Sequence, residues 1–214
     1  MSENSSSAIE IYLVTGGTGL LGYHIVRALV ARGEQRVSVF SLHAPPKGDQ
    51  VEDVTYYQGD IADEAQVRHV LAQVSYYDQV LRCYLHLNDK LIKTAATTVF
   101  HTTSILPGQS AEIYHRVNVI GVRILITACH AEKVQKLIYT SSTGVVWKNS
   151  NFQGISEEEA KIPTKGYDPY HHTKAIGENL VLNEDGVDGL RTVALRPCLI
   201  FGYGSSSYTI YSYS

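Results

Sequence analysis

The segment Tyr170-His171-His172-Thr173-Lys174 holds a phenol and an amine four residues apart. On a helix, residues with this spacing share one face. A phenol has a pKa of about 10, and a lysine cation beside it would stabilise the phenolate and lower that pKa. Tyr170 could then act as a general acid or base near neutral pH, with Lys174 as its partner. The pair therefore predicts proton transfer at an alcohol or a ketone.

A second source of hydroxyl groups is Thr140-Ser141-Ser142, which lies about 28 residues before Tyr170. We expect a strand over residues 136–141, and the carboxyl end of such a strand is on the ligand side of a doubly wound sheet. A serine placed there can orient the oxygen of a substrate alcohol or ketone. The position in the chain does not by itself choose between Ser141 and Ser142.

Three glycines, Gly16, Gly19 and Gly22, follow the apolar run at residues 9–14 and open an amphipathic stretch over residues 20–31. In a strand–turn–helix context, Gly16 would allow the tight turn and Gly19 would let the backbone approach a pyrophosphate. Gly22 would let the helix pack against the strand. The positive end of the helix would then face the phosphates. This context predicts dinucleotide binding; the alternative is a glycine-rich turn without a ligand.

The elements that must position these residues alternate along the chain. Strands are expected at residues 9–14, 36–42, 54–58, 98–102, 136–141 and 191–196. Helices are expected at residues 20–31, from about residue 64, at residues 111–131, and from Asp168-Pro169 to about residue 182. This alternation predicts an α/β fold, a Rossmann-type doubly wound parallel sheet with helices on both faces.

The expected domain organisation is simple. A disordered N-terminus at residues 1–8 precedes an NAD(P)-binding Rossmann domain at residues 9–201, and residues 202–214 form an irregular tail. Residues 75–96 fit this scheme poorly, because only a short connection is needed before the next strand. We interpret them as an extension of the preceding helix or as an inserted surface helix.

Composition excludes several classes of partner. A net charge of −3 gives no reason to expect nucleic acid or an anionic membrane. Cys83, Cys129 and Cys198 are widely spaced and odd in number, which favours a reducing compartment. The sequence contains no run of about 18 apolar residues, so no transmembrane helix is predicted. No group of side chains has the spacing of metal ligands. We expect a cytoplasmic protein; for a full-length form, the surface of the endoplasmic reticulum is an open alternative.

Taken together, these motifs resemble the extended short-chain dehydrogenase/reductase superfamily. Within it, the chain is most similar to the 3β-hydroxysteroid dehydrogenase family, including the sterol 4α-carboxylate 3-dehydrogenases. The resembling segments are residues 15–22, Gly59-Asp60-Ile61, residues 99–101, residues 117–121, residues 138–142, Tyr170 with Lys174, residues 195–197 and residues 200–202. They span nearly the whole chain in the order that the family has.

The resemblance implies NAD(P)-dependent oxidation of a 3β-hydroxyl on a steroid or sterol by hydride transfer. Tyr170 would be the acid and base, Lys174 its partner, and Ser142, preferred to Ser141, the residue that positions the substrate oxygen. With a 4α-carboxysterol, the product would be a β-keto acid that can lose carbon dioxide. The partner would be a small steroid, sterol or other alcohol; the oligomeric state stays open, with a homodimer as one alternative.

The resemblance also implies a set of cofactor contacts. These are Gly16, Gly19, Leu20 and Gly22 at the pyrophosphate, Ser41 near the ribose, Asp60 and Ile61 beside the adenine, Tyr170 and Lys174, and Pro197 with Cys198 bordering the nicotinamide. Asn118 would be either structural or part of a proton relay, and His101 is a further candidate contact at the end of its strand.

Two departures from the family pattern qualify these expectations. NAD enzymes carry Asp or Glu about 20 residues after the glycine turn, whereas this chain has Ser41, Leu42 and His43. The cofactor is therefore expected to be NAD or NADP without a choice between them. Relatives also continue well past Pro197, so we expect a C-terminally truncated chain whose substrate domain is largely missing.

Two alternatives compete with the dehydrogenase. A nucleotide-sugar epimerase or dehydratase of the same superfamily is one; sugar dehydratases place Asp-Glu after the hydroxyl residue, where this chain has Thr143 and Gly144. The other is a truncated, catalytically weak NAD(P)-binding protein, which the missing substrate domain favours and the intact Tyr170 and Lys174 disfavour.

Overall fold

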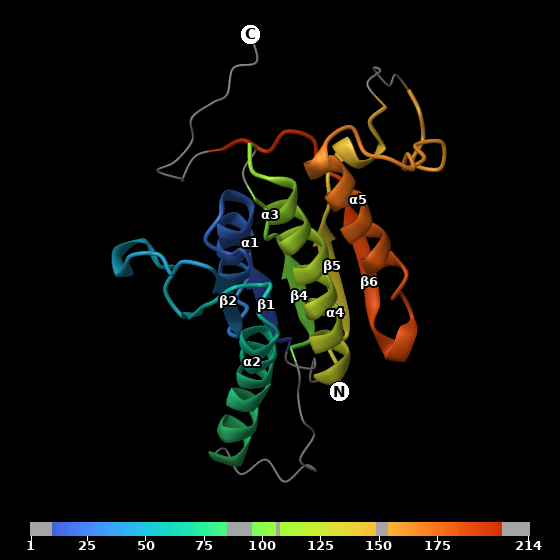
Figure 1. Ribbon diagram of the computed structural model, residues 1–214. Coiled ribbons are helices and arrows are strands. Elements are labelled where there is room, and N and C mark those ends of the chain that lie inside the picture. Colours follow the sequence, from blue (N-terminus) through green and yellow to red (C-terminus); the bar gives the residue numbers. More distant parts are fainter. Residues whose placement is uncertain (1–9, 85–95, 106–107, 149–153, 203–214) are drawn as a thin grey trace, which may run out of the picture.

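A computed structural model describes residues 10–84, 96–105, 108–148 and 154–202. Its centre is a six-stranded sheet in the order β3-β2-β1-β4-β5-β6, and every neighbouring pair is parallel. The strands are β1 (Tyr12–Thr15), β2 (Val37–Ser41), β3 (Val54–Gln58), β4 (Thr98–His101), β5 (Lys136–Thr140) and β6 (Arg191–Leu195) (Figure 1). The direction of winding reverses between β1 and β4, where such sheets bind ligands.

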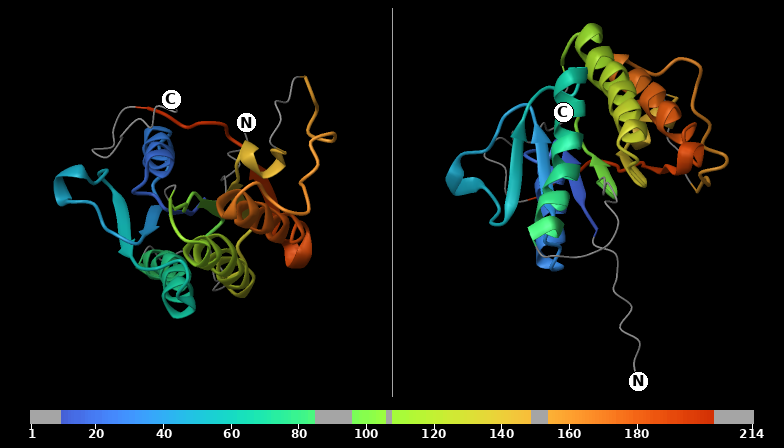
Figure 2. Two further views of the ribbon diagram at one scale, coloured as in Figure 1. Left: turned by 45° about the horizontal axis from the view of Figure 1, so that its top comes forward. Right: turned by 90° about the horizontal axis from the view of Figure 1, so that it is seen from below.

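Helices cover both faces of the sheet (Figure 2). They are α1 (Leu20–Ala31), α2 (Glu64–Tyr84), α3 (Ala111–His115), α4 (Val122–Ala131) and α5 (Pro169–Leu182), with short helical turns η1 (Lys47–Asp49), η3 (Thr143–Val146) and η4 (Val187–Gly189). α1 packs on one face, against β1 and β2. α2, α4 and α5 pack on the other face. The predicted Rossmann-type α/β fold is therefore confirmed.

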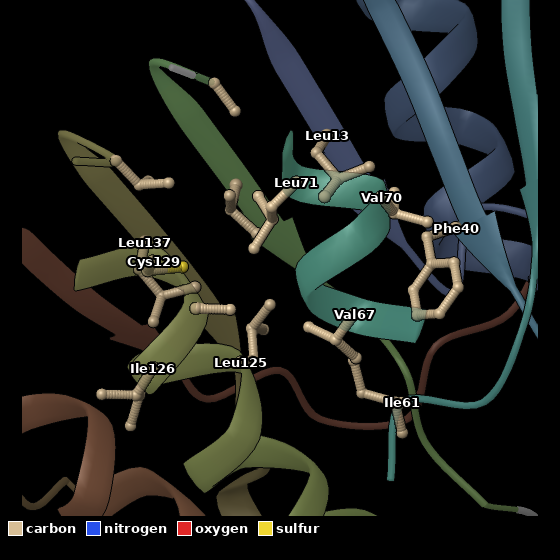
Figure 3. Packing of buried hydrophobic residues seen from close by; sticks show 14 of the residues in the cluster. Leu13, Phe40, Ile61, Val67, Val70, Leu71, Leu125, Ile126, Cys129 and Leu137 are labelled. Carbon is tan, nitrogen blue, oxygen red and sulfur yellow. The ribbon is translucent and has the colours of Figure 1, made fainter. Parts of the chain in front are cut away.

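The larger core fixes the strands relative to α2 and α4. Leu13 of β1, Leu71 of α2 and Leu137 of β5 are buried in one cluster with Leu125 and Ile126 of α4 (Figure 3). Burying a leucine side chain stabilises a fold by about 1.5–3 kcal/mol. This packing holds the carboxyl ends of the strands in one rigid edge, which is where the polar residues predicted from the sequence stand.

The helix predicted over residues 111–131 forms, but it is not uniform. α3 and α4 are joined by a π-helical segment, η2 (Arg116–Gly121). A π-helical turn holds one extra residue per hydrogen-bonded ring, and such turns are common at functional sites. Here the turn buries Asn118. The sequence pattern predicts the helix but carries no signal for this local widening.

The poorly fitting segment extends the preceding helix as far as Tyr84, as one of the two interpretations expected. Residues 85–95 lie outside the described residues, as do the expected disordered N-terminus at residues 1–8 and all but Gly202 of the expected tail. Among the helices that the structure describes, none combines the length and the apolar character needed to cross a bilayer.

Candidate active site

A large cleft opens along the carboxyl ends of the strands, with a volume of about 1030 Å³. Its walls come from the turn before α1, the ends of β2, β3, β4 and β5, the start of α5 and the segment after β6. Most of the site residues predicted from the sequence line it: Gly16, Gly19, Leu20, Gly22, Ser41, Asp60, Ile61, Ser142, Tyr170, Lys174 and Pro197. The structure thus brings together residues that are up to 181 positions apart in the chain (Gly16 to Pro197).

The glycine turn is packed too closely for any side chain. Gly16 has φ +74°, and a Cβ on it would lie 2.8 Å from the backbone of Thr103. A Cβ on Gly22 would lie 2.3 Å from the Gly16 carbonyl oxygen. Gly19 caps α1 without a side-chain hydrogen bond, and the first turn of α1 has no acidic residue. The positive end of α1 is therefore open to an anion such as a pyrophosphate, which fits a dinucleotide.

The end of β2 supports this turn. Ser41 is buried, and its Oγ accepts a hydrogen bond from the Thr18 backbone N–H at 3.3 Å. Leu42 and His43 follow it along the wall of the cleft. The place at which NAD enzymes carry an acidic residue is thus held by a serine that also braces the glycine turn.

Asp60 and Ile61 lie at the end of β3, on the same side of the cleft. The Asp60 carboxylate accepts a hydrogen bond from Arg116 Nη2 at 2.6 Å and another from the Ala62 N–H at 2.8 Å. Ile61 is buried and packs against Gly121 of η2. Asp60 is therefore an anchor for η2 as well as part of the wall.

Tyr170 is placed by the start of α5. Asp168 caps the helix by accepting a hydrogen bond from the His171 N–H at 2.8 Å, and Pro169 occupies the first turn. Burial raises the pKa of Tyr170, and interactions with the nearby hydroxyls of Ser104 and Ser142 oppose that rise without cancelling it. Tyr170 is therefore a protonated phenol near neutral pH in this form of the protein.

Lys174 lies one turn further along α5 and is only 2% exposed. Its Nζ donates a hydrogen bond to the Thr140 carbonyl oxygen at 2.5 Å and lies 4.3 Å from the centre of the Tyr139 ring. Burial lowers the pKa of Lys174 to about 7, and the negative charge of Glu178 opposes that shift. The prediction that this lysine lowers the pKa of Tyr170 is therefore wrong. Burial raises the pKa of the phenol, and burial also lowers the pKa of the lysine.

The two serines after β5 point to different surroundings. Ser142 begins η3, and its Oγ accepts a hydrogen bond from the Gly144 N–H at 3.1 Å in addition to the interaction with Tyr170. Ser141 is buried, and its hydroxyl donates to the carboxylate of Glu178. Both serines line the cleft, but Ser142 is the one that interacts with Tyr170, whereas the Ser141 hydroxyl is engaged by the buried Glu178.

Three further residues belong to this site and were not predicted as site residues. Ser104 follows β4, lines the cleft and lies close enough to Tyr170 to favour its phenolate. Glu178 is fully buried and pairs with Arg196, whose Nη2 lies 2.6 Å from the Glu178 Oε1. Ser104 stands just after a strand, where the sequence could have suggested a hydroxyl. Glu178 stands four residues after Lys174, on the same helix face.

Asn118 and His101 lie beneath the cleft and do not line it. The Asn118 Nδ2 donates to Thr173 Oγ1 at 3.0 Å, whereas its buried Oδ1 has no hydrogen-bond partner among the described residues. His101 Nδ1 lies 2.6 Å from Thr15 Oγ1. Burial and, to a smaller extent, Lys174 lower the pKa of His101 to about 3, so its ring is neutral.

Cys198, in contrast, lies exposed in the cleft wall.

The fold and the cleft define a class. A parallel sheet in this order, with a glycine turn leading into its first helix and a Tyr–Lys pair at the strand ends, is the architecture of the NAD(P)-dependent short-chain dehydrogenases and reductases. In the part of the chain that is described, no group of three or more His, Cys, Asp or Glu is arranged to hold a metal ion. The class uses NAD or NADP, as the glycine turn led us to expect.

Comparison with known proteins is consistent with this class and narrows it to a family. The chain belongs to the 3-beta hydroxysteroid dehydrogenase/isomerase family, whose sequence profile matches residues 13–212. The resemblance noted in the sequence is thereby confirmed.

Individual relatives match over most of this chain. It is 35% identical to the 2-alkyl-3-oxoalkanoate reductase of Stenotrophomonas maltophilia, over 90% of this chain and 51% of that protein. It is 32% identical to the decarboxylating sterol-4-alpha-carboxylate 3-dehydrogenase of Mus musculus, over 93% of this chain and 48% of that protein. The crystal structure of UDP-glucose 4-epimerase from Brucella ovis in complex with NAD is similar with a TM-score of 0.67 and 28% identity, over 87% of this chain and 51% of that chain. The chain spans about half the length of these relatives.

Proposed function

We propose that this chain carries the cofactor cleft and the acid–base group of an enzyme that oxidises a 3β-hydroxyl on a steroid or sterol with NAD or NADP. A sterol with a 4α-carboxylate is the substrate we favour. The observation that carries the proposal is the meeting of the Ser142 and Tyr170 side chains in the cleft that the glycine turn also lines.

Each residue has a defined task in this reaction. Ser142 holds the substrate hydroxyl, and Tyr170 as phenolate removes its proton. The hydroxyls of Ser104 and Ser142 favour the phenolate, while burial favours the protonated phenol, which suits proton donation in the reverse direction. Lys174 would hold the nicotinamide ribose. A nicotinamide dinucleotide, when bound, supplies the acceptor for the hydride.

The names of two relatives support the substrate class. A 2-alkyl-3-oxoalkanoate and a sterol 4α-carboxylate oxidised at C3 both carry the reacting oxygen on the carbon β to a carboxylate. We infer that the substrate of this chain has the same arrangement. Oxidation of such an alcohol gives a β-keto acid, and this product can lose carbon dioxide without a further protein group.

A turnover assay tests the proposal. The purified chain is mixed with NAD or NADP and, in separate arms, with a 4α-carboxy-3β-hydroxysterol, the same sterol without its carboxylate, and UDP-glucose. The formation of reduced nicotinamide is followed in every arm. The UDP-glucose arm is also analysed for a new nucleotide sugar, because epimerisation and dehydration leave no net reduced nicotinamide. We expect oxidation of the carboxysterol and none of UDP-glucose. Reaction with UDP-glucose alone would support the nucleotide-sugar alternative, and cofactor binding without any oxidation would support the catalytically weak alternative; either result contradicts the proposal.

The choice of cofactor and the location complete the proposal. Ser41 and His43 stand where the ribose 2′ position would be read, so a titration of NADH against NADPH decides the preference. The location we propose is the cytoplasm, or the surface of the endoplasmic reticulum in a longer form. It rests on the odd, widely spaced cysteines, of which Cys129 and Cys198 are free thiols.

A further inference from the structure

A buried carboxylate lies one helical turn beyond Lys174. Glu178 has no exposed surface, and both of its oxygens are engaged. Arg196 donates from Nη2 to Oε1 at 2.6 Å and from Nε to Oε1 at 3.1 Å, and the Ser141 hydroxyl donates to Oε2. Removing a carboxylate from water costs several kcal/mol unless it is well paired. These contacts explain how the charge is tolerated, but not what it does there.

The position of the network suggests a task. Its three members come from α5 and from the segments directly after β5 and β6. Each lies in the lining of the cleft or close to it in the chain: Ser141 lines the cleft beside Ser142, Arg196 precedes Pro197, and Glu178 follows Lys174 by four residues. Backbone hydrogen bonds link the same strand ends, since the Ser141 N–H donates to the Leu195 carbonyl at 2.7 Å. The network therefore ties α5 to the ends of β5 and β6 directly behind the catalytic groups.

The surroundings of Lys174 show what the charge of Glu178 changes. The titratable groups that interact with the lysine are Tyr139 from β5, His101 from β4 and Glu178 from α5, and Tyr170 lies one helical turn before it on α5. The two tyrosines are protonated and His101 is neutral near pH 7, because burial raises the pKa of both phenols and lowers that of the imidazole. Glu178 is the carboxylate of this set, and it opposes the loss of the lysine proton.

We infer that Glu178, clamped by Arg196 and Ser141, is a positioning residue that keeps the Lys174 side chain at the end of β5 in its ammonium form. The importance of this for turnover rests on the function proposed above. The electrostatic effect itself rests only on the described fold, so it can be tested whether or not the chain oxidises an alcohol.

The direct test measures the titration of Lys174 by NMR, with carbon-13 at the lysine ε position and the signal assigned by its loss in Lys174→Arg. In Glu178→Gln we expect the pKa of Lys174 to fall by about one unit or more, the shift that an opposite charge nearby normally produces. In Arg196→Gln, which removes a cation and leaves the carboxylate, we expect the pKa to rise. The pKa of Lys174 would not shift in opposite directions in these two variants if the ion pair served only to hold α5 against β6.

Controls keep the result decisive. Glu184 lies just after α5, and its carboxylate pairs with His130. Glu184→Gln removes this carboxylate and should leave the Lys174 titration unchanged. If a single variant unfolds, the double variant Glu178→Gln with Arg196→Gln leaves no unpaired buried charge, and its Lys174 pKa should still lie below that of the wild type. An unchanged pKa in Glu178→Gln, or shifts in the same direction in the two single variants, would overturn the inference. If the enzyme is active, the inflection of its pH–rate profile near neutral pH should shift in each variant in the same direction as the pKa of Lys174.

Discussion

At the scale of single residues, two adjacent serines divide the work of the site. Ser142 adjoins Tyr170 in the cleft, and Ser141 donates to the buried carboxylate of Glu178. Neighbouring residues in an extended backbone point to opposite sides, so two adjacent serines contact different partners. The order Thr-Ser-Ser alone could not show which serine adjoins Tyr170 and which contacts Glu178.

This division predicts opposite phenotypes. Ser142→Ala should lower the turnover rate on the order of 10²-fold, because the substrate oxygen loses its positioning partner, with little change in thermal stability. Ser141→Ala should cost about 1–3 kcal/mol of unfolding free energy, because a buried acceptor loses its donor, with a smaller effect on turnover. Initial rates and chemical unfolding of both variants provide the check. Equal losses of turnover in the two would contradict the assignment.

At the scale of elements, the turn before α1 depends on close backbone contact. A Cβ on Gly22 would lie 2.3 Å from the Gly16 carbonyl oxygen, whereas a Cβ on Gly48 of η1 would meet no atom within 4 Å. Gly22→Ala should therefore open the turn, cost about 1–3 kcal/mol of stability and weaken NADH binding at least about tenfold. Gly48→Ala should leave binding unchanged. NADH fluorescence titrations of both variants measure this, and unweakened binding by Gly22→Ala would show that the turn does not hold the cofactor.

Much of the element level was predictable because its signals are local. The glycine turn, the Asp168-Pro169 start of α5 and the alternating strands are encoded within a few residues each, and all of them form where expected. The π-helical segment around Asn118 and the Glu178–Arg196 pair were not predictable, because they depend on which elements become neighbours. The raised pKa of Tyr170 was missed for the same reason: a lysine four residues away is visible in sequence, but the burial that outweighs it is not.

At the scale of the whole molecule, the layer beneath the cleft makes stability depend on pH. Burial and Lys174 lower the pKa of His101 to about 3 from an ordinary value of 6.5. Between these pH values the unfolded chain binds a proton that the folded chain does not, so stability falls as the pH drops from about 6.5 towards 3. A shift of this size corresponds to at most roughly 4–5 kcal/mol.

His101→Gln should remove much of this acid sensitivity, because glutamine does not titrate. Urea unfolding at a series of pH values between about 7 and 4 gives the free energy of unfolding for the wild type and the variant. The slope against pH should be shallower in His101→Gln and unchanged in His69→Gln, which alters an exposed residue of α2. If the His101 variant and the wild type have equal slopes, this histidine is not the buried neutral group described above.

Tyr170 is the group proposed to move the proton, and measuring cofactor binding beside turnover separates that task from a role in binding. NADH binding and sterol oxidation are measured side by side for the wild type, Tyr170→Phe and the control Tyr167→Phe, whose ring packs on Trp147 and does not line the cleft. Tyr170→Phe should bind NADH about as well as the wild type but turn over at least about 10²-fold more slowly, while Tyr167→Phe should change neither. Turnover by Tyr170→Phe at the wild-type rate would contradict the account.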